Sequence, residues 1–203
     1  MGFFSCIPQK GDVIVYDKYV HASVYDRMHA SCVDWECLTP FAHNSVKALC
    51  LALTIVRNQI ENRQSVFVAV ESLYSMDGMF VPLTEMVEVI DNISPARNTY
   101  FIVNEAHSMG IYGPQGRSHV TMLGLENWVL ACLHTFGKAL AVSGAVIVTN
   151  TVVRDYLLNY ARPLIYTTSP THAMIIAADV SFDMLIDETA SYLHLLSLVC
   201  LLI

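Results

Sequence analysis

One lysine in this chain has the surroundings that a lysine nucleophile needs. Lys138 lies in the uncharged segment Thr-Phe-Gly-Lys-Ala-Leu (135–140), directly after an apolar run. A lysine amine is nucleophilic only when it is unprotonated, and a desolvated position lowers its pKa. The segment therefore indicates a reactive amine, although the spacing alone also fits a surface lysine in a turn.

Two histidines and two threonines are candidates to act with this lysine. His107 lies in a turn after another apolar run, and His21 begins a stretch with helical spacing. Each also fits a plainer role, as a polar turn residue or a residue near a helix cap. The hydroxyls of Thr135 and Thr168 flank Lys138 in the sequence and would suit phosphate oxygens. No group of histidines has the spacing of metal ligands, so we expect no metal site.

The elements that must position these side chains alternate along the chain. Five apolar runs read as buried strands, at Val13–Tyr16, Val66–Val70, Tyr100–Val103, Trp128–Leu133 and Ala145–Thr149. Helical spacing is found at Ala22–Ser31, Ser45–Asn62, Pro82–Ile93, Val152–Tyr160 and Ala173–Ile186. This alternation predicts an α/β fold in which a mostly parallel sheet has helices on both faces.

Polar segments follow three of the predicted strands, beginning at Glu71, Asn104 and His134. In open parallel sheets, ligands bind at the carboxyl ends of the strands. The three segments therefore predict one shared site. Their agreement is stronger evidence for a site than any single motif.

Composition excludes several classes of partner. The chain has 203 residues, of which 54% are hydrophobic and 14% charged, with a net charge of −7. An acidic chain without a run of Lys or Arg is not expected to bind nucleic acid. No window reaches the roughly 18 apolar residues of a membrane span, so we expect no membrane partner. The six cysteines form no Cys-x-x-Cys pair and the N-terminus does not read as a signal peptide, which favours reduced cysteines and a cytoplasmic location.

The polar segments also match, in order and with similar spacing, the motifs of one family. The chain resembles the α-oxoamine synthases, within the class-II pyridoxal-phosphate-dependent aminotransferase superfamily, and is most similar to their biotin-pathway branch. The likeness runs from about Phe4 to about Ile186. The segments that carry it are Glu71–Gly78, Val103–Gly110, Gly113–Arg117, Thr135–Leu140 and Asp155–Ser169.

The resemblance implies a fold and a cofactor. It implies the large domain of a fold-type I pyridoxal-phosphate enzyme, which is usually a homodimer. Lys138 would form the Schiff base with pyridoxal 5′-phosphate. His21 would stack on the ring, and His107 and Ser75 would lie near its phenolic oxygen. Thr135 would contact the phosphate, and Thr168 would reach the phosphate of the partner subunit.

The implied reaction is a decarboxylating condensation of an amino acid with an acyl thioester, in biotin or related secondary-metabolite synthesis. Two alternatives stay open. The same cofactor core supports a pyridoxal-phosphate-dependent aminotransferase. The chain is also compatible with a non-catalytic remnant, or with a subunit that needs a partner chain.

The chain departs from the family pattern at its ring-nitrogen position, where Asn104 replaces an aspartate. An amide carries no charge to hold a proton on the pyridine nitrogen. Losing a charge-assisted bond of about 1.5–3 kcal/mol lowers the protonated fraction by about one to two decades. Glu105 is not expected to substitute, because neighbouring residues on a strand face opposite sides.

The predicted domain organisation is incomplete by comparison with the family. Residues 1–186 are expected to form a partial large domain that lacks its N-terminal glycine-rich part. Residues 187–203 are expected to be a divergent apolar tail. The C-terminal small domain, which supplies an arginine for the substrate carboxylate in the family, is expected to be absent.

Overall fold

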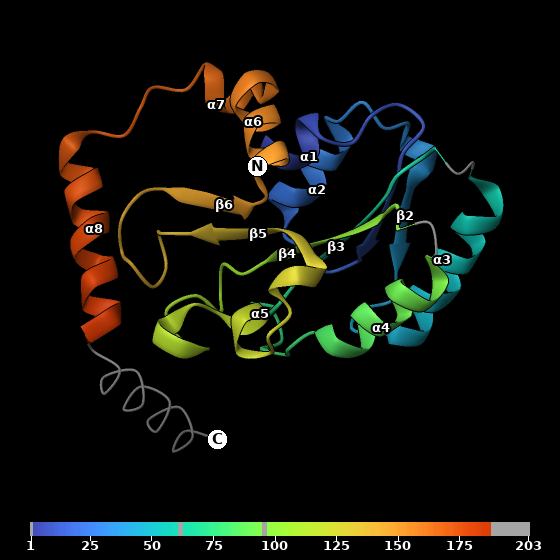
Figure 1. Cartoon of the computed structure of the whole chain (residues 1–203), viewed down its shortest axis with the longest axis horizontal. Helices are drawn as coiled ribbons and strands as arrows, with labels where there is room; N and C mark the ends of the chain where they lie inside the picture. Colours follow the sequence, from blue (N-terminus) through green and yellow to red (C-terminus); the bar gives the residue numbers. More distant parts are fainter. Residues whose placement is uncertain (1, 61–62, 95–96, 188–203) are drawn as a thin grey trace.

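The computed structural model describes residues 2–60, 63–94 and 97–187, which form one six-stranded sheet in the order β2-β1-β3-β4-β5-β6 (Figure 1). All neighbouring strands are parallel except β5 and β6, which are antiparallel. The prediction of a mostly parallel sheet is therefore confirmed. The strands are β1 (Val13–Asp17), β2 (Leu38–Phe41), β3 (Val66–Glu71), β4 (Thr99–Asn104), β5 (Val129–Thr135) and β6 (Ala145–Thr149).

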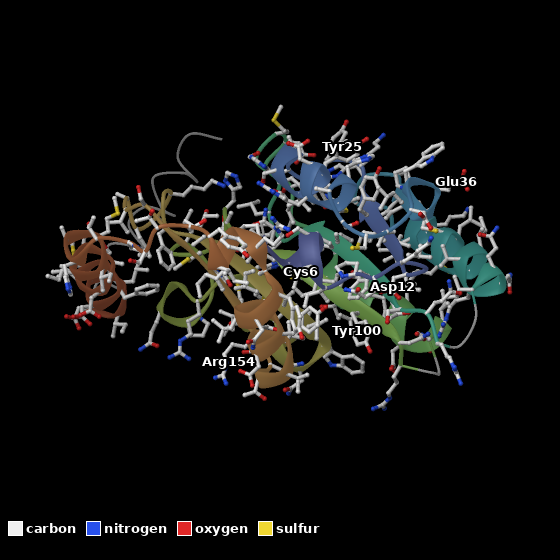
Figure 2. All side chains as sticks on the ribbon, turned by 90° about the horizontal axis from the view of Figure 1, so that it is seen from above. Cys6, Asp12, Tyr25, Glu36, Tyr100 and Arg154 are labelled. Atoms are coloured by element: carbon white, nitrogen blue, oxygen red, sulfur yellow. The ribbon has the colours of Figure 1, made fainter. Side chains whose placement is uncertain are left out.

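Helices cover both faces of this sheet (Figure 1). One face carries α3 (Val46–Gln59), α4 (Leu83–Ile93) and the short α5 (His119–Met122). The other face carries α1 (Gly2–Cys6), α2 (Ala22–His29) and α6 (Thr151–Tyr160). Figure 2 shows Cys6 of α1 between α2 and α6. The chain continues through α7 (Arg162–Ile165) into α8 (His172–Asp187), which lies beyond the turn between β5 and β6 (Figure 1).

Burial on both faces explains why the central strands are apolar throughout. Every residue of β1 and of β3 is buried. Val66, Val68 and Val70 pack against α3 and α4, whereas Phe67 and Ala69 pack on the side of α1 and α2. Successive side chains of a strand point to opposite faces, so a strand covered on both sides needs an unbroken apolar run.

The structure corrects the sequence prediction at several elements. β2 was not predicted, because Pro40 interrupts it; the strand lies at the edge of the sheet, where a missing N–H costs little. The strand predicted at Trp128–Leu133 begins and ends later, so Thr135 lies within β5. The helix predicted from Ser45 begins at Val46 with Ser45 as its cap and ends at Gln59. The very short α1, α5 and α7 were also missed. The tail predicted at residues 187–203 lies, apart from Asp187, outside the described residues.

The described cysteines are all free. Cys32 is exposed and the other four are half-buried. Burial raises the pKa of Cys6 to about 11 and that of Cys132 to about 12, which keeps both as thiols at neutral pH. Within the described part of the chain, no helix has the length and apolar character needed to cross a membrane.

Glu105 anchors the end of β4 to α5. Its carboxylate is fully buried and accepts hydrogen bonds from the Ser108 hydroxyl at 2.7 Å, the His119 N–H at 3.0 Å and the Val120 N–H at 3.1 Å. The side chain therefore faces the side of the sheet opposite to Asn104, as strand alternation requires. Glu105 is thus committed to the fold.

Replacing Glu105 by Gln should lower the free energy of unfolding by about 2–3 kcal/mol. An amide has only one acceptor atom, so one N–H of α5 would face an NH₂ group in a buried position. Chemical denaturation measures this loss. Glu88→Gln on exposed α4 surface is the matched control, and should stay within about 0.5 kcal/mol of the wild type. Equal stability of the two variants would contradict the anchoring role.

Candidate active site

The carboxyl ends of β3, β4 and β5 lie side by side in register. Glu71 pairs with Asn104, and Asn104 pairs with Leu133. By strand alternation, Glu71 shares a face with Ala69, and Asn104 shares one with Ile102. Ala69 and Ile102 both pack in the core beneath α1 and α2. The register therefore brings the Glu71 carboxylate and the Asn104 amide to one face at one edge of the sheet.

The turn between β5 and β6 carries Lys138. The Phe136 N–H donates to the Gly144 carbonyl at 2.9 Å, which closes the turn at its base. On the outside, the Ser181 hydroxyl of α8, which is 2.7 Å from the Ala177 carbonyl of its own helix, also lies 3.2 Å from the Leu140 carbonyl. Lys138 is thus presented by a turn that is held at both the sheet and the covering helix.

Lys138 reaches His107 across the site. Its Nζ lies 2.8 Å from His107 Nε2, a hydrogen-bond distance between groups at the ends of β5 and β4. Burial lowers the pKa of Lys138, and the nearby Glu71 carboxylate partly opposes this shift. Burial lowers the pKa of His107, and the positive charges of Lys138 and His21 lower it further. Both shifts favour a neutral pair that shares one hydrogen, the state in which an amine is nucleophilic.

A glycine lets the two loops of this pair come together. Gly110 has φ +78°, and a Cβ added to it would lie 2.4 Å from the Cβ of Ala139, the neighbour of Lys138. Its N–H donates to the Gly116 carbonyl at 2.8 Å. A side chain at position 110 would therefore push the Lys138 turn away from the loop that carries His107.

His21 is the N-cap residue of α2 and lies beside Glu71, at the carboxyl end of β3. Its ring Nδ1 accepts a hydrogen bond from the Ser23 N–H at 3.1 Å. The backbone N–H of His21 donates to Glu71 Oε1 at 2.5 Å. Burial raises the pKa of Glu71, while hydrogen bonds from His21 and Asn104 and the charge of Lys138 lower it in part. His21, Glu71, Asn104, His107 and Lys138 are therefore one electrostatically coupled group.

Thr135 has a hydroxyl that is ready for an external partner. It follows Leu133 by two positions on β5 and so faces the side of Glu71 and Asn104. Its Oγ1 is buried and, within the described ranges, forms no hydrogen bond. A buried hydroxyl without a partner is costly unless a ligand supplies one. A phosphate oxygen would satisfy it.

Two predicted site residues are not brought into this group. Ser75 lies exposed in the turn after β3, and Thr168 lies exposed after α7. Among the residues that the structure describes, neither hydroxyl contacts Lys138 or His107. Their predicted roles at the cofactor and at a partner's phosphate stay predictions.

Sequence reasoning missed a network that borders the site. His43 bridges Asp17 at 2.9 Å and Asp77 at 2.8 Å, and its ring stacks on Tyr19 with 4.3 Å between centroids. The fully buried Asp17 also accepts from the Asn44 N–H at 2.8 Å. The network ties the turn that holds Ser75 to β1. Asp17 directly follows the strand predicted at Val13–Tyr16, just as the candidate segments follow their strands, and this position was the available signal.

A further cavity lies away from this site. It has a volume of about 810 Å³ and is lined by residues such as Thr99, Trp128, Val129 and Asn150. Thr99 and Val129 begin β4 and β5, so this cavity lies towards the amino ends of the strands, away from Lys138.

A mostly parallel sheet with helices on both faces and a lysine–histidine pair at its carboxyl edge fits the large domain of fold-type I pyridoxal-phosphate enzymes. Comparison with known proteins agrees. The model of the aminotransferase class I and II family matches residues 2–193. The chain therefore belongs to this pyridoxal-phosphate-dependent family.

Individual relatives narrow the likeness to the α-oxoamine synthases. The chain is 42% identical over 198 residues to an 8-amino-7-oxononanoate synthase of Emericella nidulans, covering 96% of this chain and 48% of that protein. It is 39% identical over 189 residues to an aminoacyl transferase of Aspergillus fumigatus, covering 91% and 40%.

A solved structure gives the same result. A serine palmitoyltransferase variant from S. paucimobilis, with a pyridoxal phosphate–myriocin aldimine bound, matches with a TM-score of 0.82 and 30% identity, over 94% of this chain and 46% of that one. The chain thus spans about half the length of the relatives it matches.

Replacing Gly110 by Ala should displace Lys138 and weaken binding of pyridoxal phosphate by about tenfold or more, because small misplacements of reacting groups are costly. Titration followed by the visible absorption of the bound cofactor measures this effect. Gly124→Ala is the matched control, since Gly124 has φ +67° but open space around it. Both variants should lose about 1 kcal/mol of stability from the positive φ. Equal cofactor affinity in both would contradict the steric role of Gly110.

Proposed function

We propose that the chain is a pyridoxal-phosphate-dependent transferase that joins an amino acid to an acyl thioester and releases the carboxylate of the amino acid as CO₂. The observation that carries this proposal is the 2.8 Å contact between Lys138 Nζ and His107 Nε2 at the carboxyl edge of the sheet. The relatives named 8-amino-7-oxononanoate synthase and serine palmitoyltransferase support the reaction class. Biotin synthesis or a related secondary-metabolite pathway is the proposed setting.

The residues present fit the cofactor. Bound pyridoxal phosphate supplies an aldehyde that reacts with amines and a ring that accepts the electron pair released at an amino acid's α-carbon. Lys138 would hold it covalently, and the unpartnered Thr135 hydroxyl would donate to its phosphate. His21 would cover the ring, and His107 and Ser75 would lie near its phenolic oxygen.

Lys138 and His107 would then transfer protons to and from the substrate. Burial lowers the pKa of Lys138, which makes its unprotonated amine more available than that of an ordinary lysine, and the same amine would take up a proton from the substrate. His107 Nε2 is within hydrogen-bonding distance to receive or return that proton. A protein with Lys138 charged and turned to solvent would do neither.

We also propose that the protein acts as a homodimer. The helix α8 exposes apolar side chains on several sides, including Ile175, Ile176 and Met184, and β6 exposes Val148. Exposed apolar surface of this extent is typical of an interface. The exposed Thr168 would then lie where a second copy can be reached.

A second candidate is a chain that binds the cofactor but lacks the family reaction on its own. Asn104 favours it, because the amide cannot hold a proton on the pyridine nitrogen as an aspartate does. No feature of the described residues favours an aminotransferase over a synthase.

Purified protein with pyridoxal phosphate should show a visible absorption band that Lys138→Ala abolishes, because Lys138 is the lysine that contacts His107 at the site. Lys47→Ala, on exposed surface of α3, is the matched control and should keep the band. With amino acids and acyl-coenzyme A, the wild type should release CO₂ and free thiol together, and Lys138→Ala should lower both by at least about a hundredfold.

The outcomes separate the candidates. A band with no release of CO₂ or thiol from any donor pair would favour the cofactor-binding candidate. An amino-group transfer to a keto acid without thiol release would indicate an aminotransferase. A band that survives Lys138→Ala would contradict the proposal.

Ile176→Glu should shift the protein from dimer to monomer, because a charge buried without a partner in an apolar interface is unfavourable. Sedimentation velocity measures the change. Asp183→Asn, on the same exposed helix, serves as control and should leave the dimer intact. A monomeric wild type would contradict the dimer proposal.

A further inference from the structure

A short hairpin follows β3 at the edge of the sheet that carries the candidate site. Leu73 and Phe80 face each other in an antiparallel bridge, and the Val81 N–H donates to the Ser72 carbonyl at 3.1 Å. The exposed Ser75 lies in the turn between these two segments. We call residues 72–81 the Ser75 hairpin. Because the hairpin leaves directly from the end of β3, it borders the site.

The base and the tip of the Ser75 hairpin are held by different contacts. At the base, the Ser72 N–H donates to the Asn104 carbonyl at 3.0 Å, and the Ser72 hydroxyl lies 2.9 Å from that of Ser108. Towards the tip, Asp77 Oδ2 lies 2.8 Å from His43 Nε2. The His43 contact therefore fixes the part of the hairpin that is farthest from β4.

The other nitrogen of the His43 ring contacts a second carboxylate. Nδ1 lies 2.9 Å from Oδ1 of Asp17, the last residue of β1. Asp17 is fully buried, and its two oxygens also accept the backbone N–H groups of Tyr19 and Asn44, each at 2.8 Å. Asp17 is thus an acceptor that the backbone holds in place.

Asp77 is an acceptor as well. Its Oδ1 accepts from the Met79 N–H at 3.0 Å, and this hydrogen bond, followed by the one to His43, lowers the pKa of Asp77. A carboxylate accepts but cannot donate, whereas a neutral imidazole has one N–H and one lone pair. The two contacts of His43 are therefore both hydrogen bonds only when both of its ring nitrogens carry hydrogen.

Aromatic side chains enclose the same ring. His43 stacks on Tyr19 with 4.3 Å between centroids and meets Tyr74 edge to face at 4.5 Å. An aromatic face attracts a cation, which suits a protonated imidazole. Burial raises the pKa of Tyr74, so its phenol stays neutral. Two charged groups lie farther out: Lys18 Nζ is 5.4 Å from the centroid of the Tyr19 ring, and Glu71 borders Tyr74.

We propose that His43 is a positioning residue that holds the Ser75 hairpin to β1 only while both of its ring nitrogens carry hydrogen. As the pH rises and the ring loses a proton, one nitrogen meets a carboxylate lone pair to lone pair. The side chain of Asp17 is 0% exposed and that of Asp77 is 29% exposed, so Asp77 is the partner that is released to water. The consequence for the site rests on the proposed function, in which Ser75 lies beside the cofactor.

The test titrates the full chain from about pH 6 to about pH 9, on either side of the ordinary histidine range. The ¹⁵N NMR signals of the ring nitrogens report protonation, and His43→Gln identifies the signal of His43 among the eight histidines. Hydrogen exchange of the Gly78 and Met79 amides, corrected for its intrinsic pH dependence, reports the hairpin. We expect their protection to fall about tenfold as the His43 ring loses its proton. The Gly110 N–H, in the loop that carries His107, should keep its protection.

Asp77→Asn should remove this pH dependence, because an amide can also bridge to a neutral ring. Its Oδ1 would accept from the Met79 N–H while its Nδ2 donates to His43 Nε2, and the ring Nδ1–H would stay on Asp17. Protection of the hairpin should then stay constant across the titration. At its alkaline end, Asp77→Asn should bind pyridoxal phosphate about tenfold more tightly than the wild type, and at its acid end equally. Asp91→Asn, on exposed surface of α4, is the matched control and should follow the wild type.

The outcomes are distinct. A His43 ring with hydrogen on only one nitrogen throughout would overturn the inference, as would an equal loss of protection in Asp77→Asn. Equal cofactor affinity of Asp77→Asn and the wild type at the alkaline end would overturn the positioning role and leave the proposed function standing. If no cofactor is bound covalently, seen as no added mass on the borohydride-reduced chain, the proposed function fails and the role of the hairpin at the site fails with it.

Discussion

The in-register pairing of β3, β4 and β5 is the constraint on which the candidate site depends. It places Glu71 beside Asn104 and brings Asn104 level with Leu133, so that the residues following each strand meet at one edge. A shift of one residue in any strand would send its site side chain to the opposite face. The apolar cores on both sides of the sheet resist such a shift, because it would also expose or misplace each buried valine and phenylalanine.

Asn104 ends β4 and Glu105 follows it. Their side chains face opposite sides of the sheet, so Glu105 stabilises the fold while Asn104 lies on the side of the candidate site. Both carboxylate oxygens of Glu105 accept hydrogen bonds, from the Ser108 hydroxyl and from two N–H groups of α5, so this carboxylate is committed to the fold. Asn104 faces the other way, toward Glu71. The loop that follows is brought onto the Lys138 turn by Gly110. The position of Lys138 therefore depends on the close approach of this loop at Gly110.

Much of this arrangement could be predicted from the sequence, for a simple reason. Strands buried on both faces leave uninterrupted apolar runs, and the polar residues after them must meet at one edge if the sheet is parallel. Lys138 and His107 were placed together on that argument, and the structure joins them directly. Strand β2 was not predicted, because Pro40 interrupts its apolar run.

Contacts between distant side chains left no local signal. The bridge from Asp17 through His43 to Asp77 joins three segments whose spacing resembles no motif. Glu71 was noted only as part of a motif, and its hydrogen bond from the His21 N–H and its pairing with Asn104 emerge only when α2, β3 and β4 are assembled. Local pattern thus fixes which residues reach the site, whereas packing decides how they pair.

Peptide mapping after borohydride reduction with pyridoxal phosphate tests the central claim most directly. Because burial lowers the pKa of Lys138, its amine stays reactive at pH values where an ordinary lysine, with a pKa of about 10.4, is protonated. The account predicts that near pH 7 the label is found on the peptide that contains Lys138, and spreads to Lys10, Lys18 and Lys47 only as the pH rises. Labelling that is equal on all four lysines at neutral pH would contradict it.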